Sequence, residues 1–164
     1  MADGGTTAAW RPMRPDDLAI VAAIADRVHL DHPEDPAVFA DRLALFPAGC
    51  LVVEADCGAL GYCISHPGIV GQPPPLDTVL GRIDGADCLY IHDLCLLPEA
   101  RGRGLAAAIA RLLEEVARAH GFGCIALTAV NDSDGFWQSQ GFEAHPCSKL
   151  ASYGAASYRL KRLG

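Results

Sequence analysis

The pattern of apolar and polar positions divides the chain into predicted helices and strands. Apolar residues recurring every three or four positions predict helices over 15–28, 35–46, 102–120 and 131–140. Apolar runs bounded by turn residues predict strands at 10–14, 51–54, 60–65, 88–97, 124–130, 142–145 and 157–161. Between them, the prolines of the 66–87 segment predict an irregular connection with one helical turn near 76–80.

The order of these elements indicates the fold class. A strand, a helix and a uniformly apolar strand follow one another over 88–130, which is typical of a βαβ unit with two parallel strands. The segments 51–54 and 60–65 are separated by a short polar turn and predict an antiparallel hairpin. We therefore expect an α/β protein with a central mixed, mostly antiparallel sheet flanked by helices.

Length and composition suit one compact unit. The chain has 164 residues, of which 51% are apolar and 20% charged, so a sizeable core can form and disorder is excluded. We expect a disordered tail over 1–9 and a single domain over 10–164. The start of the chain has no basic, apolar leader, and no apolar run is long enough to span a membrane. A cytoplasmic location is the expectation.

Net charge limits the kinds of binding partner that we expect, and the cysteine pattern limits the expected disulfides and metal sites. The net charge of −7 argues against nucleic acid and anionic membranes as partners, and it is compatible with a cationic acceptor such as an amine. The seven cysteines are odd in number, form no CxxC pair and mostly lie in apolar runs, so we expect free thiols. No Cys/His cluster has zinc spacing, so no metal is expected.

The segment between the strand at 88–97 and the helix at 102–120 carries the strongest chemical signal. Gly102 and Gly104 allow a ligand to approach the backbone, and the N–H groups of the helix start favour an anion. Arg101 and Arg103 add positive charge. These features predict a pyrophosphate cradle. The alternative is a glycine-rich connection that binds nothing.

Two interpretations of the phosphate ligand in this cradle are open, and the first is a dinucleotide. The spacing Gly102-x-Gly104-x-x-Ala107 formally matches a dinucleotide fingerprint. In a dinucleotide fold, however, the glycines turn directly off the strand, whereas Pro98-Glu-Ala-Arg101 intervenes here. Only about sixty residues follow, too few to complete a dinucleotide domain.

The other interpretation is a family resemblance. The sequence Arg101-Gly-Arg-Gly104-Leu-Ala106 resembles the Arg/Gln-x-x-Gly-x-Gly/Ala signature of GNAT acetyltransferases. The preceding run from Asp93 to Glu99 resembles the strand that leads into that signature. Downstream, Asn131 and the run from Phe136 to Phe142 resemble the second conserved block of the family. The order of elements agrees over nearly all of 10–162.

The resemblance implies a site for acetyl-CoA, with no metal. In this family the fourth and fifth strands splay apart, and the cosubstrate enters the cleft between them. The resemblance assigns pantetheine contacts to the fourth strand, at Leu94, Cys95 and Leu96. It assigns the pyrophosphate to Arg101, Gly102, Arg103, Gly104, Leu105 and Ala106. It places Asn131, Phe136 and Trp137 along the opposite side of the cosubstrate.

Catalysis requires a neutral amine, because an ammonium has no lone pair with which to attack the thioester. Strict alternation places Tyr90, His92, Leu94 and Leu96 on one face of the strand, with Asp93 and Cys95 on the other. Histidine titrates near neutral pH, and one branch of the family has histidine at the matching position. We therefore predict His92 as the base, directly or through water, with Tyr90 as a second catalytic candidate. The alternative for His92 is a strand histidine bonded to a backbone carbonyl.

One position departs from the family. A tyrosine that often serves as general acid is replaced by Trp137, whose indole N–H does not usefully release a proton. Tyr153, Tyr158 or water are the remaining candidates for the acid. The predicted function is direct transfer of an acetyl group from acetyl-CoA to a primary amine of a small molecule or peptide. The alternative is a non-catalytic acyl-CoA-binding or sensing module. A homodimer is suggested by the frequency of dimers in the family.

Overall fold

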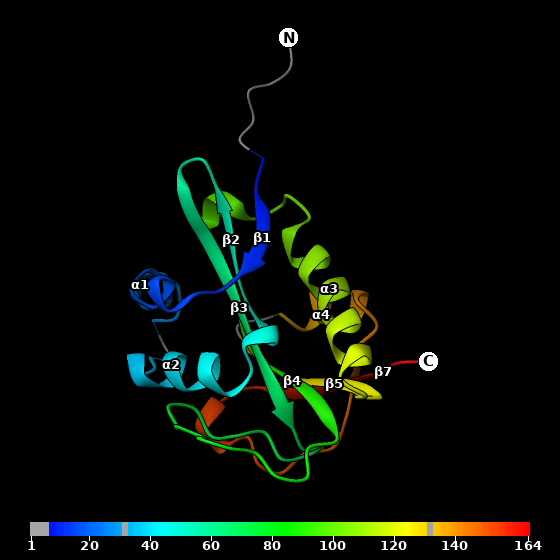
Figure 1. Cartoon of the computed structure of the whole chain (residues 1–164). Coiled ribbons are helices and arrows are strands. Elements are labelled where there is room, and N and C mark those ends of the chain that lie inside the picture. Colours follow the sequence, from blue (N-terminus) through cyan, green and yellow to red (C-terminus); the bar gives the residue numbers. More distant parts are fainter. Residues whose placement is uncertain (1–6, 31–32, 131–132) are drawn as a thin grey trace.

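A computed structural model describes residues 7–30, 33–130 and 133–164. Seven strands of this described chain form one sheet in the order β1-β2-β3-β4-β5-β7-β6 (Figure 1). They are β1 (Ala9–Pro12), β2 (Cys50–Ala55), β3 (Gly58–Gly68), β4 (Cys88–Leu96), β5 (Cys124–Ala129), β6 (Glu143–Ala144) and β7 (Ser157–Arg162). Only β4 and β5 are parallel neighbours. The predicted mixed, mostly antiparallel sheet is confirmed.

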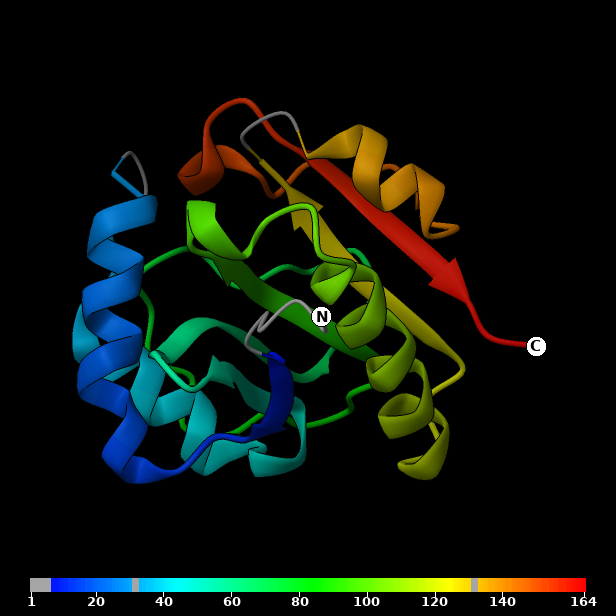
Figure 2. The ribbon, with the colours of Figure 1, turned by 90° about the horizontal axis from the view of Figure 1, so that it is seen from above.

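Helices cover both faces of the sheet (Figures 1 and 2). The α-helices are α1 (Leu18–Val28), α2 (Pro36–Leu45), α3 (Leu105–Ala119) and α4 (Asp134–Ser139). Short 3-10 helices are η1 (Pro15–Asp17), η2 (Pro47–Gly49), η3 (Pro98–Ala100) and η4 (Ala151–Tyr153). Apolar side chains of α1 and α2 pack with β2 and β3 in one buried cluster, whereas α3 and Trp137 of α4 pack with β4 and β5 in another. The sheet therefore separates an α1/α2 face from an α3 face.

The helix starts follow the sequence signals. Asp35 caps α2, since its Oδ1 accepts a hydrogen bond from the N–H of Ala37 at 2.9 Å. The α3 helix begins at Leu105 rather than at residue 102, because Gly102 and Gly104 adopt φ values of +75° and +74°. This left-handed backbone interrupts the helix and is easily adopted by glycine.

The irregular segment is shorter than the sequence predicts, and the described structure has no helix in it. β3 continues to Gly68, so the connection to β4 spans 69–87. The helical turn expected near 76–80 is wrong, because Asp77 has a φ of +55° and the chain there makes only a turn.

The described structure begins just before its first strand. Residues 1–6, most of the predicted tail, lie outside the described residues, and β1 begins at Ala9, paired with Glu54. Among the helices that the structure describes, none combines the length and the apolar character needed to cross a membrane.

Candidate active site

The parallel strands β4 and β5 pair over only three positions and then diverge. The last pair is Ile91 with Leu127. A cavity of about 820 Å³ opens at this point, with walls from β4, β5, the end of α1, the start of α3 and α4. The splayed cleft that the family resemblance implied is therefore part of the fold.

The glycine-rich segment forms one end of the cavity. Arg101, Gly102, Gly104, Leu105 and Ala106 lie in its wall, whereas Arg103 does not. A Cβ atom at either glycine would meet no other atom within 4 Å, so both residues keep open space beside the backbone.

The start of α3 supplies donors to the same space. The first hydrogen bond within the helix runs from the N–H of Ala108 to the carbonyl of Gly104 at 3.1 Å. The three preceding N–H groups, at residues 105–107, are those that helix geometry leaves without a carbonyl partner. Together with the Arg101 guanidinium, this arrangement suits a diphosphate group.

A β-bulge changes the orientation of the β4 side chains. Ile64 of β3 pairs with Asp93, and the next residue, Ser65, pairs with Ile91. His92 is therefore the extra residue of the bulge, and the two-residue alternation is interrupted there.

The expected common face of Tyr90, His92, Leu94 and Leu96 is therefore wrong. Leu94 and Leu96 pack with residues of the α3 side. Tyr90 and His92 face the opposite side, where the ring of His66 lies 5.4 Å from Tyr90 and 6.2 Å from His92, between centroids. Asp93 and Cys95 share that α1/α2 face, contrary to the alternation.

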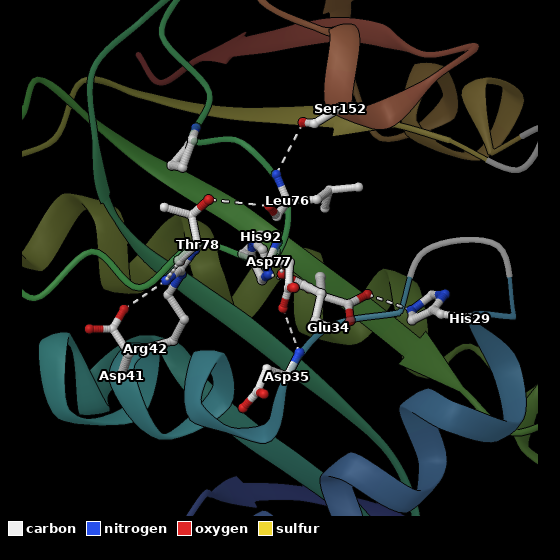
Figure 3. Close-up of polar contacts among 12 residues, drawn as sticks. His29, Glu34, Asp35, Asp41, Arg42, Leu76, Asp77, Thr78, His92 and Ser152 are labelled. Carbon is white, nitrogen blue, oxygen red and sulfur yellow. Dashed lines mark hydrogen bonds and ion pairs between the residues drawn. The ribbon is translucent and has the colours of Figure 1, made fainter.

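His92 is bonded to a carboxylate from the connection between α1 and α2. Its Nε2 lies 2.7 Å from Oε1 of Glu34 (Figure 3). Because a carboxylate only accepts, Nε2 carries a proton, and in the neutral ring the lone pair resides on Nδ1. Nδ1 is buried and has no hydrogen-bond partner among the described residues. His92 lies in the cavity wall, but its side chain has 0% exposure.

Glu34 is held in its ionised form. Burial alone would raise the pKa of Glu34, but the hydrogen bonds from His92 and from the N–H of Asp77 outweigh burial and lower this pKa. Oε2 of Glu34 accepts the Asp77 N–H at 3.0 Å, and the Asp35 N–H donates to Asp77 Oδ1 at 2.6 Å. The 69–87 segment thus positions the carboxylate beside His92 (Figure 3).

That segment is anchored on two further sides. Asp41 of α2 accepts hydrogen bonds from the N–H groups of Leu80 and Gly81, and the buried Arg42 donates to the Thr78 carbonyl at 2.8 Å. On the far side, the Leu76 N–H donates to Ser152 of η4 (Figure 3). These contacts explain how a proline-rich connection can hold a fixed position over the site.

A second pair, half-buried, lies in the cavity wall. Nε2 of His29, the residue that ends α1, lies 2.8 Å from Oδ1 of Asp93, and the Tyr62 hydroxyl bonds to the other carboxylate oxygen. Burial tends to lower the pKa of His29, but Asp93, together with Cys95, outweighs burial and raises this pKa to about 10. Burial tends to raise the pKa of Asp93, and the His29 partnership lowers it overall. The pair is charged, and both carboxylate oxygens are engaged.

Sequence reasoning missed the roles of His29 and Glu34. The available signal was the density of titratable residues over 29–35, between two predicted helices. That density does not indicate which of them reaches β4, because the answer depends on how α1 and α2 pack on the sheet.

The far wall of the cavity is aromatic. Phe136 and Trp137 of α4 both line it, and the Trp137 ring packs edge-on against Phe136 and Phe142 at centroid distances of 4.8 and 5.3 Å. Leu94, Cys95 and Leu96 line the opposite wall. Asn131 lies outside the described residues.

The candidates for a general acid are set back from the cavity. The Tyr153 hydroxyl donates to the Pro74 carbonyl at 2.6 Å, and the Tyr158 hydroxyl accepts from the Gly71 N–H at 2.9 Å. Neither residue lies in the cavity wall. Burial raises the pKa of Tyr158 to about 12. Tyr90, whose pKa burial also raises, reaches the wall only through a hydrogen bond to Thr128.

Across residues 7–30, 33–130 and 133–164, no group of three His, Cys, Asp or Glu side chains is arranged to hold a metal ion. All seven cysteines are free, and Cys95 is the one of them that lines the cavity.

Comparison with known proteins identifies the sequence family. The sequence profile described as "Acetyltransferase (GNAT) family" matches residues 17–142. No curated protein matches the chain significantly.

Solved structures share the fold at low sequence identity. Ard1 from Thermoplasma volcanium has a TM-score of 0.74 and 15% identity, with 96% of this chain and 98% of that chain covered. Arabidopsis thaliana Naa50, solved with the bisubstrate analogue CoA-Ac-MVNAL, has a TM-score of 0.73 and 15% identity, with 95% and 99% covered. N-acetylglutamate synthase from Neisseria gonorrhoeae, solved with coenzyme A and N-acetyl-glutamate, has a TM-score of 0.74 and 14% identity. That match covers 96% of this chain and 35% of the synthase chain.

Proposed function

This chain belongs to the GNAT family of N-acetyltransferases, and we propose that it transfers an acetyl group from acetyl-CoA directly to a primary amine of a small molecule or peptide. The observation that carries this proposal is one continuous cavity at the splay of β4 and β5. It joins the glycine cradle of α3 to the wall that contains His92.

The chain's own groups are suited to hold acetyl-CoA. The free N–H groups at the start of α3 and the Arg101 guanidinium would bind the pyrophosphate. Beyond Ile91, β4 has no neighbouring strand on the β5 side, so its backbone can bond an extended pantetheine arm as a sheet bonds an added strand. Phe136 and Trp137 would pack along the arm from the opposite wall.

We assign the base to His92, with Glu34 as its positioning residue. The lone pair of the amine forms the new C–N bond as the C–S bond of the thioester breaks, and the amine proton passes to Nδ1 of His92, directly or through water. The Glu34 carboxylate fixes the ring and stabilises its protonated form, because Nε2–H already donates to Oε1. The departing thiolate takes its proton from water, since Trp137 does not release one and Tyr153 and Tyr158 lie outside the cavity wall.

The acceptor class rests on similarity and charge. The relatives include one solved with a peptide-bearing analogue and one solved with an acetylated amino acid. A net charge of −7 also suits a cationic amine. The cytoplasmic location stays a prediction from the sequence, and the homodimer stays a suggestion from the family resemblance.

An acceptor panel tests the proposal. The protein and acetyl-CoA would be mixed with free amino acids, polyamines and short peptides that have free or blocked N-termini, and products would be read by mass spectrometry. Acetylation of at least one primary amine, above the rate without protein, is expected. Binding of acetyl-CoA with no acetylated product would instead favour the binding-module alternative, which the enclosed His92 and the Trp137 substitution both motivate.

A further inference from the structure

Three hydroxyl groups connect the cavity wall to the 69–87 segment. Thr128 Oγ1 lies 2.8 Å from the Tyr90 hydroxyl, which lies 3.1 Å from the Tyr153 hydroxyl. Tyr153 donates to the Pro74 carbonyl at 2.6 Å. Both tyrosines are buried, whereas Thr128 is partly exposed and lines the cavity.

The Pro74 carbonyl at the end of this series of hydrogen bonds determines which hydroxyl donates in each bond. A carbonyl can only accept, so the single Tyr153 proton is used on Pro74. The Tyr90–Tyr153 contact is then a hydrogen bond only if Tyr90 donates, and the Thr128–Tyr90 contact only if Thr128 donates. The Thr128 hydroxyl proton therefore points toward the tyrosine pair, and its oxygen is left to accept a hydrogen bond from a group in the cavity that Thr128 lines.

Thr128 also stands at the apex of the splay. The last pair between β4 and β5 is Ile91 with Leu127, so His92 and Thr128 are the first residues beyond it on their strands. Neighbouring strands lie about 4.8 Å apart at such a pair. Both His92 and Thr128 line the cavity. They also lie on the same face of the sheet, because Thr128 contacts Tyr90 and the ring of His66 packs near both Tyr90 and His92.

We propose that Thr128 accepts an N–H bond from the acceptor amine and thereby makes the site selective for primary over secondary amines. This inference rests on the proposed acetyl transfer. A primary amine has two N–H groups beside its lone pair. While the lone pair attacks the thioester carbon, one N–H is given to the base and the other is left for Thr128.

A secondary amine has one N–H group, which the base requires. Thr128 would then face the alkyl substituent with an unsatisfied acceptor, at a stage when the nitrogen is acquiring positive charge. Hydrogen bonds to charged groups are about twice as strong as neutral ones, so the discrimination should be about 10- to 100-fold. Thr128 is thus a catalytic residue that contacts the substrate, and Tyr90 and Tyr153 are positioning residues that act through it.

The test compares a primary amine that is turned over with its N-methyl derivative, as a ratio of kcat/KM values. Thr128→Val keeps the side-chain shape and removes the acceptor, so the ratio should fall by about tenfold or more. Thr128→Ser keeps the hydroxyl and should keep the ratio. Tyr153→Phe frees the Tyr90 proton to turn toward Thr128, so the ratio should fall in the same direction by a smaller factor.

Tyr158→Phe is the matched control, since it deletes a neighbouring tyrosine hydroxyl that lies outside this chain of bonds. Its ratio should stay near wild type, and the affinity for acetyl-CoA should be unchanged in all four variants. An unchanged ratio in a folded Thr128→Val protein overturns the inference while leaving the proposed function intact. If Thr128→Val does not fold, an unchanged ratio in Tyr153→Phe overturns it. Absence of acetyl transfer by the wild type to every primary amine would overturn the proposed function and this inference with it.

Discussion

The carboxylate of Glu34 lies 2.7 Å from Nε2 of His92, although the two residues are separated by 58 positions in the chain. The pair joins the α1–α2 connection to the bulge of β4, and the carboxylate is itself held by the 69–87 segment. The base we assign is therefore positioned by its own strand together with two other parts of the chain, the α1–α2 connection and the 69–87 segment.

Removing the charge of Glu34 should slow acetyl transfer. Glu34→Gln keeps the size of the side chain, but a neutral amide stabilises a protonated His92 less well than a carboxylate does. We expect kcat to fall by about 10- to 100-fold, in proportion to the lost charge-assisted hydrogen bond. Steady-state kinetics measure this effect. Glu115→Gln, on the exposed side of α3, is the control and should have wild-type kinetics.

Removing His92 should affect the chemical step rather than cosubstrate binding. Loss of a general base typically costs about 10²- to 10⁴-fold in rate, so His92→Ala should lower the amine-dependent rate at neutral pH by that amount. The defect should shrink as pH rises, because more of the acceptor is already deprotonated. Rates between neutral and alkaline pH, with acetyl-CoA affinity measured separately, check this. A full rate in the variant would place the base elsewhere.

The glycine cradle can be blocked with a matched control. Gly104→Val adds a branched side chain where the pyrophosphate would approach, so acetyl-CoA should no longer raise the melting temperature. Gly121→Val is the control, because Gly121 has a similar φ of +78°, also has open space around it, and lies beyond the far end of α3. Both variants carry the same backbone strain. Only Gly104→Val should lose binding, and equal shifts in both would contradict the placement of the cosubstrate.

The His29–Asp93 pair should make the folded protein less stable as the pH becomes alkaline. The pKa of His29 is raised from 6.5 to about 10, so the stability that comes from its charge is complete below about pH 6.5 and is lost as pH rises through about 10. The melting temperature of the wild type should therefore fall more between these limits than that of His29→Gln. Parallel melting curves measure the difference. Identical pH dependence in both proteins would show that His29 is not charged in the folded state.

The sequence predicted the fold well, and it also predicted the glycine-rich connection before α3, because both follow from local patterns. Apolar periodicity gives the helices and strands, and the spacing of Gly102 and Gly104 before a helix places both glycines in the cavity wall, where the anion site is proposed. The faces of β4 were predicted wrongly, since alternation assumes a regular ladder and the bulge at His92 depends on pairing with β3.

Other parts of the site depend on tertiary contacts that no local pattern encodes. Glu34 reaches His92 only because α1 and α2 pack on the face toward which the bulge turns that histidine. Thr128 gains a fixed hydroxyl orientation only because Tyr90 and Tyr153, from distant segments, converge on it.

The coupling of thioester cleavage to amine acetylation tests the central claim most directly. The rate of CoA thiol release would be measured beside the rate of product formation, with a primary amine from the acceptor panel, for the wild type and Gly104→Val. The account predicts one acetylated amine for each thiol released, release that depends on the amine, and loss of both in Gly104→Val. Thiol release without acetylated amine, or acetylation that persists in a folded Gly104→Val protein, would contradict it.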